Sequence, residues 1–153
     1  MNFEVRAARE GDAEKIAELI EGFRREKIML ARSADEIRAQ VHWFQVAEDA
    51  IGIAGCVSLH VYHAGLAEVR SLAVRPDRQG QGVGRALVQA AVVLADREAI
   101  ASLCALTLEP LFFERLGFQR VDKALLPEKI WKDCAGCAFL NDCREIALVR
   151  SLH

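Results

Sequence analysis

Long hydrophobic runs and blocks of like charge are both missing from this sequence of 153 residues. No apolar stretch approaches the roughly 20 residues that a membrane-spanning helix requires. The formal net charge is −2 and the basic residues are scattered, which disfavours nucleic acid and anionic membranes as partners. The first six residues also lack the apolar core of a signal peptide. We therefore expect a cytoplasmic protein that binds neither nucleic acid nor membrane.

Internal repeats, low-complexity tracts and linkers are also missing, which predicts a single domain over residues 1–153. Hydrophobic residues make up 52% of the chain and charged residues 27%, a balance typical of globular proteins rather than disordered ones. A chain of this length can bury a substantial core without disulfides or a structural metal.

The sequence contains five cysteines, an odd number that cannot all pair in disulfides within one chain. Cys56 and Cys104 lie in apolar, strand-like runs, so we expect buried free thiols there. Cys134 and Cys137 form a Cys-x-x-Cys pair with Cys143 soon after. This stretch can begin a zinc or iron–sulfur site, form a redox pair or disulfide, or pack as ordinary thiols. Because no second Cys-x-x-Cys exists, we assign no metal ligand.

Hydrophobic periodicity predicts an α/β domain built around a mixed sheet. The expected strands cover residues 3–8, 43–47, 53–62, 66–74, 103–108, 118–121 and 145–152. Asp12 is expected to cap a first helix, and Ser33 with Glu36 forms a capping box for a second. Apolar residues recur at helical spacing between residues 83 and 94, which predicts a third helix. A short helix is predicted over residues 110–116, ended by Gly117.

Three alternate glycines, Gly80, Gly82 and Gly84, separate the strand over 66–74 from the helix that follows. Glycine adopts positive φ and lets a ligand approach the backbone closely. The helix N-terminus adds unpaired N–H groups and a positive dipole end, which suit a phosphate. Arg85 stands where a dinucleotide fingerprint has its third glycine, and the Gly-Lys-Ser/Thr of a Walker A loop is absent. A glycine-rich turn without a ligand is the alternative.

The pattern Gln-x-x-Gly-x-Gly, made by Gln79, Gly82 and Gly84, resembles the coenzyme A pyrophosphate loop of the GNAT acetyltransferase superfamily. This resemblance covers nearly the whole chain. It implies the GNAT acyl-CoA N-acyltransferase fold, a mixed and mostly antiparallel sheet flanked by helices, with acetyl-CoA as co-substrate. It also implies that main-chain groups along one continuous segment hold the diphosphate, namely Gln79, Gly80, Gln81, Gly82, Val83, Gly84 and Arg85.

The same resemblance implies that the pantetheine arm lies along the strand end formed by Leu72, Ala73 and Val74. The run from Phe112 to Phe118 is similar to the family's aromatic-x-x-x-Gly-Phe element, which would bring Phe112 and Phe113 to the thioester. The alternative for these phenylalanines is a helix cap that fills the core.

Residues 28–33, the pair Phe112-Phe113 and residues 121–129 resemble the acetyltransferase domain of N-acetylglutamate synthases. That resemblance implies acetylation of the α-amino group of L-glutamate, the first step of arginine biosynthesis. Many such synthases carry a further amino-acid-kinase-like domain that binds arginine. Because 153 residues cannot hold that domain, we expect a stand-alone catalytic form.

Acetyl transfer to an amine requires a deprotonated nitrogen and a polarised thioester carbonyl. Glu68 opens the strand that would carry the cofactor and resembles the glutamate of histone acetyltransferases, so we predict it to be the general base. It can instead be an exposed strand carboxylate or a partner of Arg70 on the same face. Backbone N–H groups near Leu72 and Ala73 are expected to polarise the carbonyl.

Many GNAT enzymes use a tyrosine before the Gly-Phe pair as the general acid, and Phe113 occupies that place here. The only tyrosine, Tyr62, belongs to a different predicted strand. We therefore expect solvent, the incoming ammonium or another side chain to protonate the thiolate.

A dicarboxylate acceptor needs cationic groups, preferably arginine. The candidates are Arg32, Arg70, Lys123 and Lys129, each of which can instead be a solvated surface cation. Other acceptors compatible with the sequence are a peptide N-terminus, a lysine or a polyamine. A coenzyme A-binding or metal-sensing module without turnover is a further alternative. GNAT proteins are often dimers, so a homodimer is possible.

Overall fold

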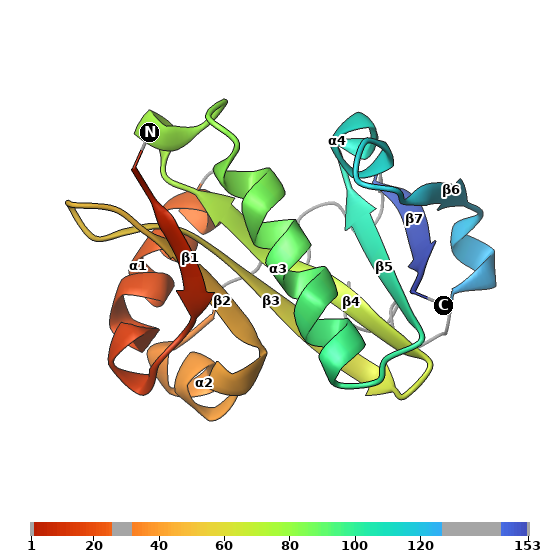
Figure 1. Ribbon diagram of the computed structural model, residues 1–153, viewed down its shortest axis with the longest axis horizontal. Coiled ribbons are helices and arrows are strands. Elements are labelled where there is room, and N and C mark those ends of the chain that lie inside the picture. Colours follow the sequence, from red (N-terminus) through yellow and green to blue (C-terminus); the bar gives the residue numbers. More distant parts are fainter. Residues whose placement is uncertain (1, 26–31, 127–144, 153) are drawn as a thin grey trace. The chain divides into compact units, whose positions relative to one another are not determined.

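The structure is a computed structural model that describes residues 2–25, 32–126 and 145–152 (Figure 1). The chain divides into two compact units. The first unit comprises Met1–His60 and Val69–Leu94. The second comprises Val61–Glu68 and Ala95–His153.

Among the described residues, seven strands form a hydrogen-bonded sheet in the order β1-β2-β3-β4-β5-β7-β6. Their bounds are β1 Glu4–Ala7, β2 Phe44–Glu48, β3 Ile53–His63, β4 Leu66–Val74, β5 Ser102–Thr107, β6 Gln119–Val121 and β7 Ile146–Ser151. The β1–β2, β2–β3, β5–β7 and β6–β7 pairs are antiparallel, and β4–β5 is parallel. The predicted mixed, mostly antiparallel sheet is therefore confirmed.

Helices lie between the strands along the chain, close to the positions that hydrophobic periodicity predicts. They are α1 Ala13–Arg25, α2 Ala34–Ala39, α3 Val83–Arg97 and α4 Pro110–Glu114. The Ser33 hydroxyl accepts the N–H of Glu36 at 3.1 Å, which confirms the expected cap. Asp12 precedes α1 as expected, but its carboxylate accepts hydrogen bonds from residues that precede it in the sequence. The donors are the Arg6 side chain at 2.8 Å and the N–H of Arg9 at 2.7 Å. It therefore stabilises the turn that leads into the helix.

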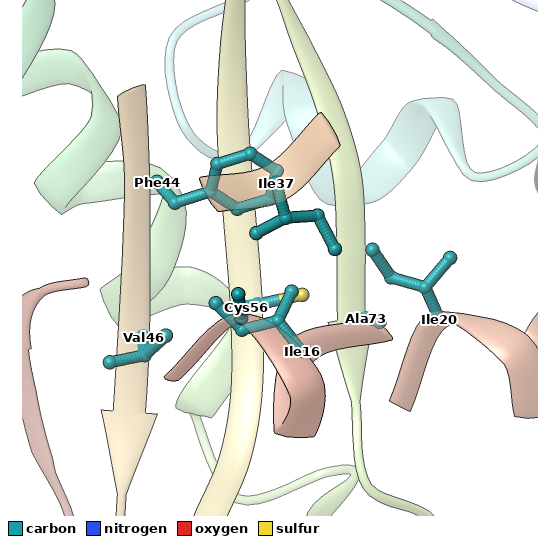
Figure 2. Packing of buried hydrophobic residues seen from close by; sticks show 8 residues of the cluster. Ile16, Ile20, Ile37, Phe44, Val46, Cys56 and Ala73 are labelled. Carbon is teal, nitrogen blue, oxygen red and sulfur yellow. The ribbon is translucent and has the colours of Figure 1, made fainter. Parts of the chain in front are cut away.

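In the first unit, α1 and α2 cover one face of the strands (Figure 2). Figure 2 shows isoleucines of both helices over the strands β2, β3 and β4. The buried cluster is Ala13, Ile16, Ile20, Ile37, Phe44, Val46, Cys56 and Ala73. The 3.6-residue spacing of the α1 members turns them all towards the sheet, which is how burial of this stripe stabilises the unit.

The opposite face carries α3, drawn in green in Figure 1. Gly55 of β3 lies directly beneath it, because a Cβ at this position would lie 2.9 Å from Leu87 Cδ1 and 3.2 Å from Val83 Cγ1. Side chains alternate between the faces of a strand, so Gly55 faces α3 while Cys56 faces α1 and α2. The glycine thus sets how closely α3 approaches the sheet.

In the second unit, β7 lies between β5 and β6, and α4 precedes β6. The buried cluster is Leu66, Cys104, Leu126 and Ala147. Gly117 has φ +89° just beyond α4, as its predicted helix-ending role requires. Arg150 donates to the carbonyl of Leu116 at 2.8 Å and so holds this corner. Cys56 and Cys104 are both free and buried, which confirms the prediction for these two thiols.

No helix of the described segments is long and apolar enough to cross a membrane. Cys134, Cys137, Cys143 and Lys129 lie outside the described residues.

Candidate active site

The strand β4 is irregular at its centre, where Ser71 adopts φ +54°. This left-handed conformation is uncommon for a residue with a Cβ and interrupts the regular pleat. Such irregularities re-aim the backbone and are frequent beside active sites. The three residues that follow, Leu72, Ala73 and Val74, are the predicted pantetheine-binding segment.

Two side chains from β3 stabilise this irregularity. Ser58 Oγ donates to the carbonyl of Arg70 at 3.2 Å, and Cys56 Sγ donates to the carbonyl of Ser71 at 3.3 Å. Burial raises the pKa of the Cys56 thiol to about 12, so it stays protonated and remains a donor at neutral pH. Cys56 therefore has a structural role, because a thiol, unlike a thiolate, is a weak nucleophile.

The chain leaves β4 through a 3₁₀ turn, Pro76–Arg78, and enters the glycine loop. Gly80 has φ +77° and Gly82 has φ +85°, conformations that favour glycine. A Cβ at either position would meet no protein atom within 4 Å. Space rather than packing therefore surrounds these two residues, and a ligand can approach the main chain there.

The helix α3 starts within the same loop. Ala86 donates its N–H to the carbonyl of Gly82 at 3.1 Å, which is the first bond of the helix. The N–H groups of the three preceding residues, Val83 to Arg85, consequently have no acceptor within the helix. Arg85 is exposed, and the first turn of α3 contains no acidic residue. This end of the helix is therefore electropositive and suited to an anion.

The two glutamines of the loop use their amides internally. Gln79 Nε2 donates to the carbonyl of Val74 at 3.0 Å, and Gln81 Nε2 donates to the carbonyl of Asp77 at 3.2 Å. The first bond ties the predicted diphosphate loop to the predicted pantetheine segment. The second connects the loop to the middle of the 3₁₀ turn and helps to hold the loop in one conformation.

Asp49, which follows β2, anchors the same loop from the β2–β3 hairpin. Its carboxylate accepts from Arg75 Nη2 at 2.6 Å and from Arg78 Nε at 2.8 Å. It also accepts the N–H groups of Ile51 at 2.9 Å and Gly52 at 3.1 Å. The hydrogen bond from Arg75 is the main cause that holds the pKa of Asp49 below its ordinary value.

Glu68 lies in the second unit and is buried, with 7% of its surface exposed. Its Oε1 accepts a hydrogen bond of 2.6 Å from the phenol of Tyr62. The alternative of an exposed strand carboxylate is therefore wrong. A charged group at this depth requires partners, and the phenol supplies one of them.

Tyr62 is a residue that sequence reasoning set aside because it belongs to a different strand. The turn between β3 and β4 returns the chain, so that Tyr62 and Glu68 become cross-strand neighbours within reach of an aromatic side chain. The sequence signal for this contact is the position of the two residues: Tyr62 lies at the end of one predicted strand and Glu68 near the start of the next.

Phe113 is buried in the second unit and Phe112 is half-buried. The ring of Phe113 meets those of Phe112 and Phe118 edge to face, at centroid distances of 5.1 and 5.2 Å. Phe113 thus packs as part of the core around α4, in agreement with the alternative of a core-filling cap. The half-buried Phe112 retains accessible surface.

The predicted acceptor-binding cations differ in setting. The guanidinium carbon of Arg32 lies 5.9 Å from the centroid of the Phe44 ring, in a cation–π arrangement. Arg70 in β4 and Lys123 beside β6 are half-buried. None of these three is a fully solvated surface cation. Within the described residues, His, Cys, Asp and Glu side chains form no group of three that could hold a metal ion.

Comparison with known proteins points to one family. The acetyltransferase (GNAT) domain matches residues 39–120. A protein of Chlorobaculum tepidum, named an uncharacterized N-acetyltransferase, is 39% identical over 97% of this chain and 96% of its own length. The amino-acid acetyltransferase of Mycobacterium tuberculosis is 35% identical over 77% of this chain and 69% of its own length.

Among solved structures, N-acetylglutamate synthase from Neisseria gonorrhoeae, complexed with coenzyme A and N-acetyl-glutamate, is similar with a TM-score of 0.86 and 31% identity. The match covers 100% of this chain and 36% of the synthase, so the chain spans about a third of that protein. The family match, the two relatives and the shared fold agree with one another. The chain belongs to the GNAT family of acetyltransferases.

Proposed function

We propose that this protein transfers the acetyl group of acetyl-CoA to the α-amino group of a small acidic amino acid, with L-glutamate as the first candidate. The observation that carries the donor half of the proposal is the loop from Gln79 to Arg85. It combines two glycines at positive φ, open space around them and the first N–H groups of α3, which have no acceptor within the helix. Main-chain groups of this kind suit a diphosphate.

The acceptor half of the proposal rests on two kinds of support. An amino-acid acetyltransferase and a synthase in complex with N-acetyl-glutamate are similar at 35% and 31% identity. The candidate cations Arg32, Arg70 and Lys123 are partly withdrawn from solvent, where they can bind carboxylates more strongly than at an exposed site. Lys129 completes the proposed set. Such an activity would serve arginine biosynthesis.

In the proposed reaction, Glu68 takes one proton from the acceptor ammonium. The amine nitrogen then attacks the thioester carbonyl carbon, with backbone N–H groups near Leu72 and Ala73 polarising the carbonyl oxygen. The new C–N bond forms and the C–S bond breaks. The second proton of the nitrogen passes through solvent to the departing thiolate, so that coenzyme A leaves as the thiol. Glu68 releases the first proton to solvent, which restores the carboxylate for the next turnover.

The test is acetylation of a panel of amines, followed as thiol release and identified by mass spectrometry. We expect turnover with glutamate to exceed that with neutral amino acids, peptide N-termini, lysine and polyamines. Glu68→Gln should lower kcat by about a hundredfold and still bind coenzyme A. Preferred turnover with another amine would replace glutamate as the acceptor. Binding of coenzyme A without turnover on any amine would favour a non-catalytic module.

A further inference from the structure

Asp49 has a less exposed side chain than Asp12 or Arg6, which form another ion pair of the first unit. Its side chain has 0% exposed surface, whereas those of its partners Arg75 and Arg78 are 21% and 20% exposed. The carboxylate accepts from both guanidinium groups and from two main-chain N–H groups of its own hairpin. The two main-chain bonds fix the carboxylate within the β2–β3 hairpin, and the two arginine bonds connect that hairpin to the segment after β4.

The two arginines bracket the 3₁₀ turn that leads into the glycine loop. Arg75 donates its main-chain N–H to the carbonyl of Ala54 at 2.7 Å, and its Nε binds Asp77 at 2.6 Å. Arg78 Nη1 donates to the Gln81 side-chain oxygen at 3.3 Å. A chain of hydrogen bonds thus runs from Asp49 through Arg78 to the middle of the loop.

This arrangement has an electrostatic consequence. Arg75 and Arg78 stand close to a loop that suits a diphosphate, yet Asp49 binds both guanidinium groups and Asp77 also binds that of Arg75, so two carboxylates balance the two positive charges. An arginine without this partner would be able to bind an anion itself and pull the turn out of place. A buried carboxylate that only accepts hydrogen bonds suits four donors, and an amide in its place cannot accept from all of them.

We propose that Asp49 is a positioning residue for the acetyl donor: through Arg75 and Arg78 it holds the turn Pro76–Arg78, and so orients the N–H groups of the following loop. The inference rests on the proposed binding of the coenzyme A diphosphate by that loop. Donors that are already aligned do not have to be ordered when the ligand binds, so loss of the anchor weakens binding. Asp49 itself touches neither acetyl-CoA nor the acceptor.

The experiment measures coenzyme A affinity by calorimetry and steady-state kinetics with acetyl-CoA and the acceptor identified above. Asp49→Asn should raise both the Kd for coenzyme A and the KM for acetyl-CoA by about tenfold or more. Its kcat at saturating donor and its KM for the acceptor should stay within about twofold of the wild type.

Asp12→Asn is the matched control. Asp12 also accepts from an arginine, Arg6, at 2.8 and 3.0 Å and from a main-chain N–H, and its side chain is 15% exposed in the same unit. We expect it to lower the thermal unfolding midpoint without changing the Kd for coenzyme A. A loss of affinity that merely follows stability would appear in both variants and would overturn the proposal.

A second variant, Arg78→Gln, keeps Asp49 paired with Arg75 and should weaken coenzyme A binding by less than Asp49→Asn. The opposite order, with loss in Arg78→Gln and none in Asp49→Asn, would mean that Arg78 contacts the donor directly, and the positioning role would be wrong. If Asp49→Asn does not fold, an unchanged Kd in Arg78→Gln rejects the inference. If the wild-type protein gives no heat with coenzyme A, the proposed function fails instead.

Discussion

The phenol of Tyr62 donates a 2.6 Å hydrogen bond to a carboxylate oxygen of Glu68. The two residues stand on either side of the turn that joins β3 to β4, and Glu68 is buried. A charge-assisted hydrogen bond of this length restrains the carboxylate in one orientation. A general base needs that restraint, because proton transfer depends on position before it depends on acidity.

Tyr62→Phe removes the hydroxyl and keeps the ring that packs in the second unit. Because the Glu68 carboxylate loses a restraining donor, we expect kcat to fall by about tenfold while the KM for acetyl-CoA is unchanged. Ser102→Ala is the matched control, since it deletes another 2.6 Å bond, from Ser102 Oγ to the carbonyl of Gly65 in the same turn. Equal kcat values in the two variants would show that Tyr62 contributes only to the fold.

The ion pairs of Asp49 predict a pH dependence of stability. The pKa of this carboxyl lies below its ordinary value of 3.8 because Arg75 donates to it. Its contribution to the free energy of unfolding is therefore complete above about pH 5 and is lost as the pH falls below about 4, towards the lower pKa of the folded state. Urea midpoints of the wild type and Asp49→Asn should differ at pH 7, and the difference should shrink progressively as the pH falls below about 4. A constant difference across this range would contradict the expectation.

Gly55→Ala should destabilise the first unit because its methyl group meets α3 at close range. The new Cβ would lie 2.9 Å from Leu87 Cδ1 and 3.0 Å from the carbonyl oxygen of Ala73, so these neighbouring atoms must give way. We expect a loss of about 1–3 kcal/mol in the free energy of unfolding, measured in urea.

Gly22→Ala provides the comparison for that substitution. Gly22 lies within α1, is exposed, and has no atom within 4 Å of a Cβ. The same change should here stabilise the protein by about 0.5–1 kcal/mol through helix propensity. Similar effects in the two glycine variants would rule out close packing at Gly55 as the cause.

Gly82→Ala tests the loop itself. At φ +85° an alanine is strained, which should cost about 1 kcal/mol of stability, although no protein atom opposes its Cβ. The methyl group would also occupy space proposed for the diphosphate, so the Kd for coenzyme A should rise by more than about tenfold. The KM for the acceptor serves as the internal reference. An unchanged Kd would place the donor elsewhere.

Much of the architecture could be predicted because the relevant signals are local. The strand β4 has the predicted bounds, Leu66–Val74, and α3 begins at Val83 as its apolar spacing indicated. The glycines at 80 and 82 have the positive φ that their place in the loop required. Periodicity and glycine chemistry depend on a few neighbouring residues, so they can be read before the chain is folded.

The partners of the charged side chains were not predictable in the same way. The sequence predicts a role for Glu68 but not its partner Tyr62, and no sequence pattern marks Asp49, which Arg78 reaches across 29 residues of sequence. Which donors meet a buried carboxylate depends on how the turns return the strands and on which groups are withdrawn from water. Those contacts exist only once the sheet has formed. The sequence by itself thus determined the elements and the glycine loop, whereas tertiary structure decided which side chains hold the loop and the proposed base in place.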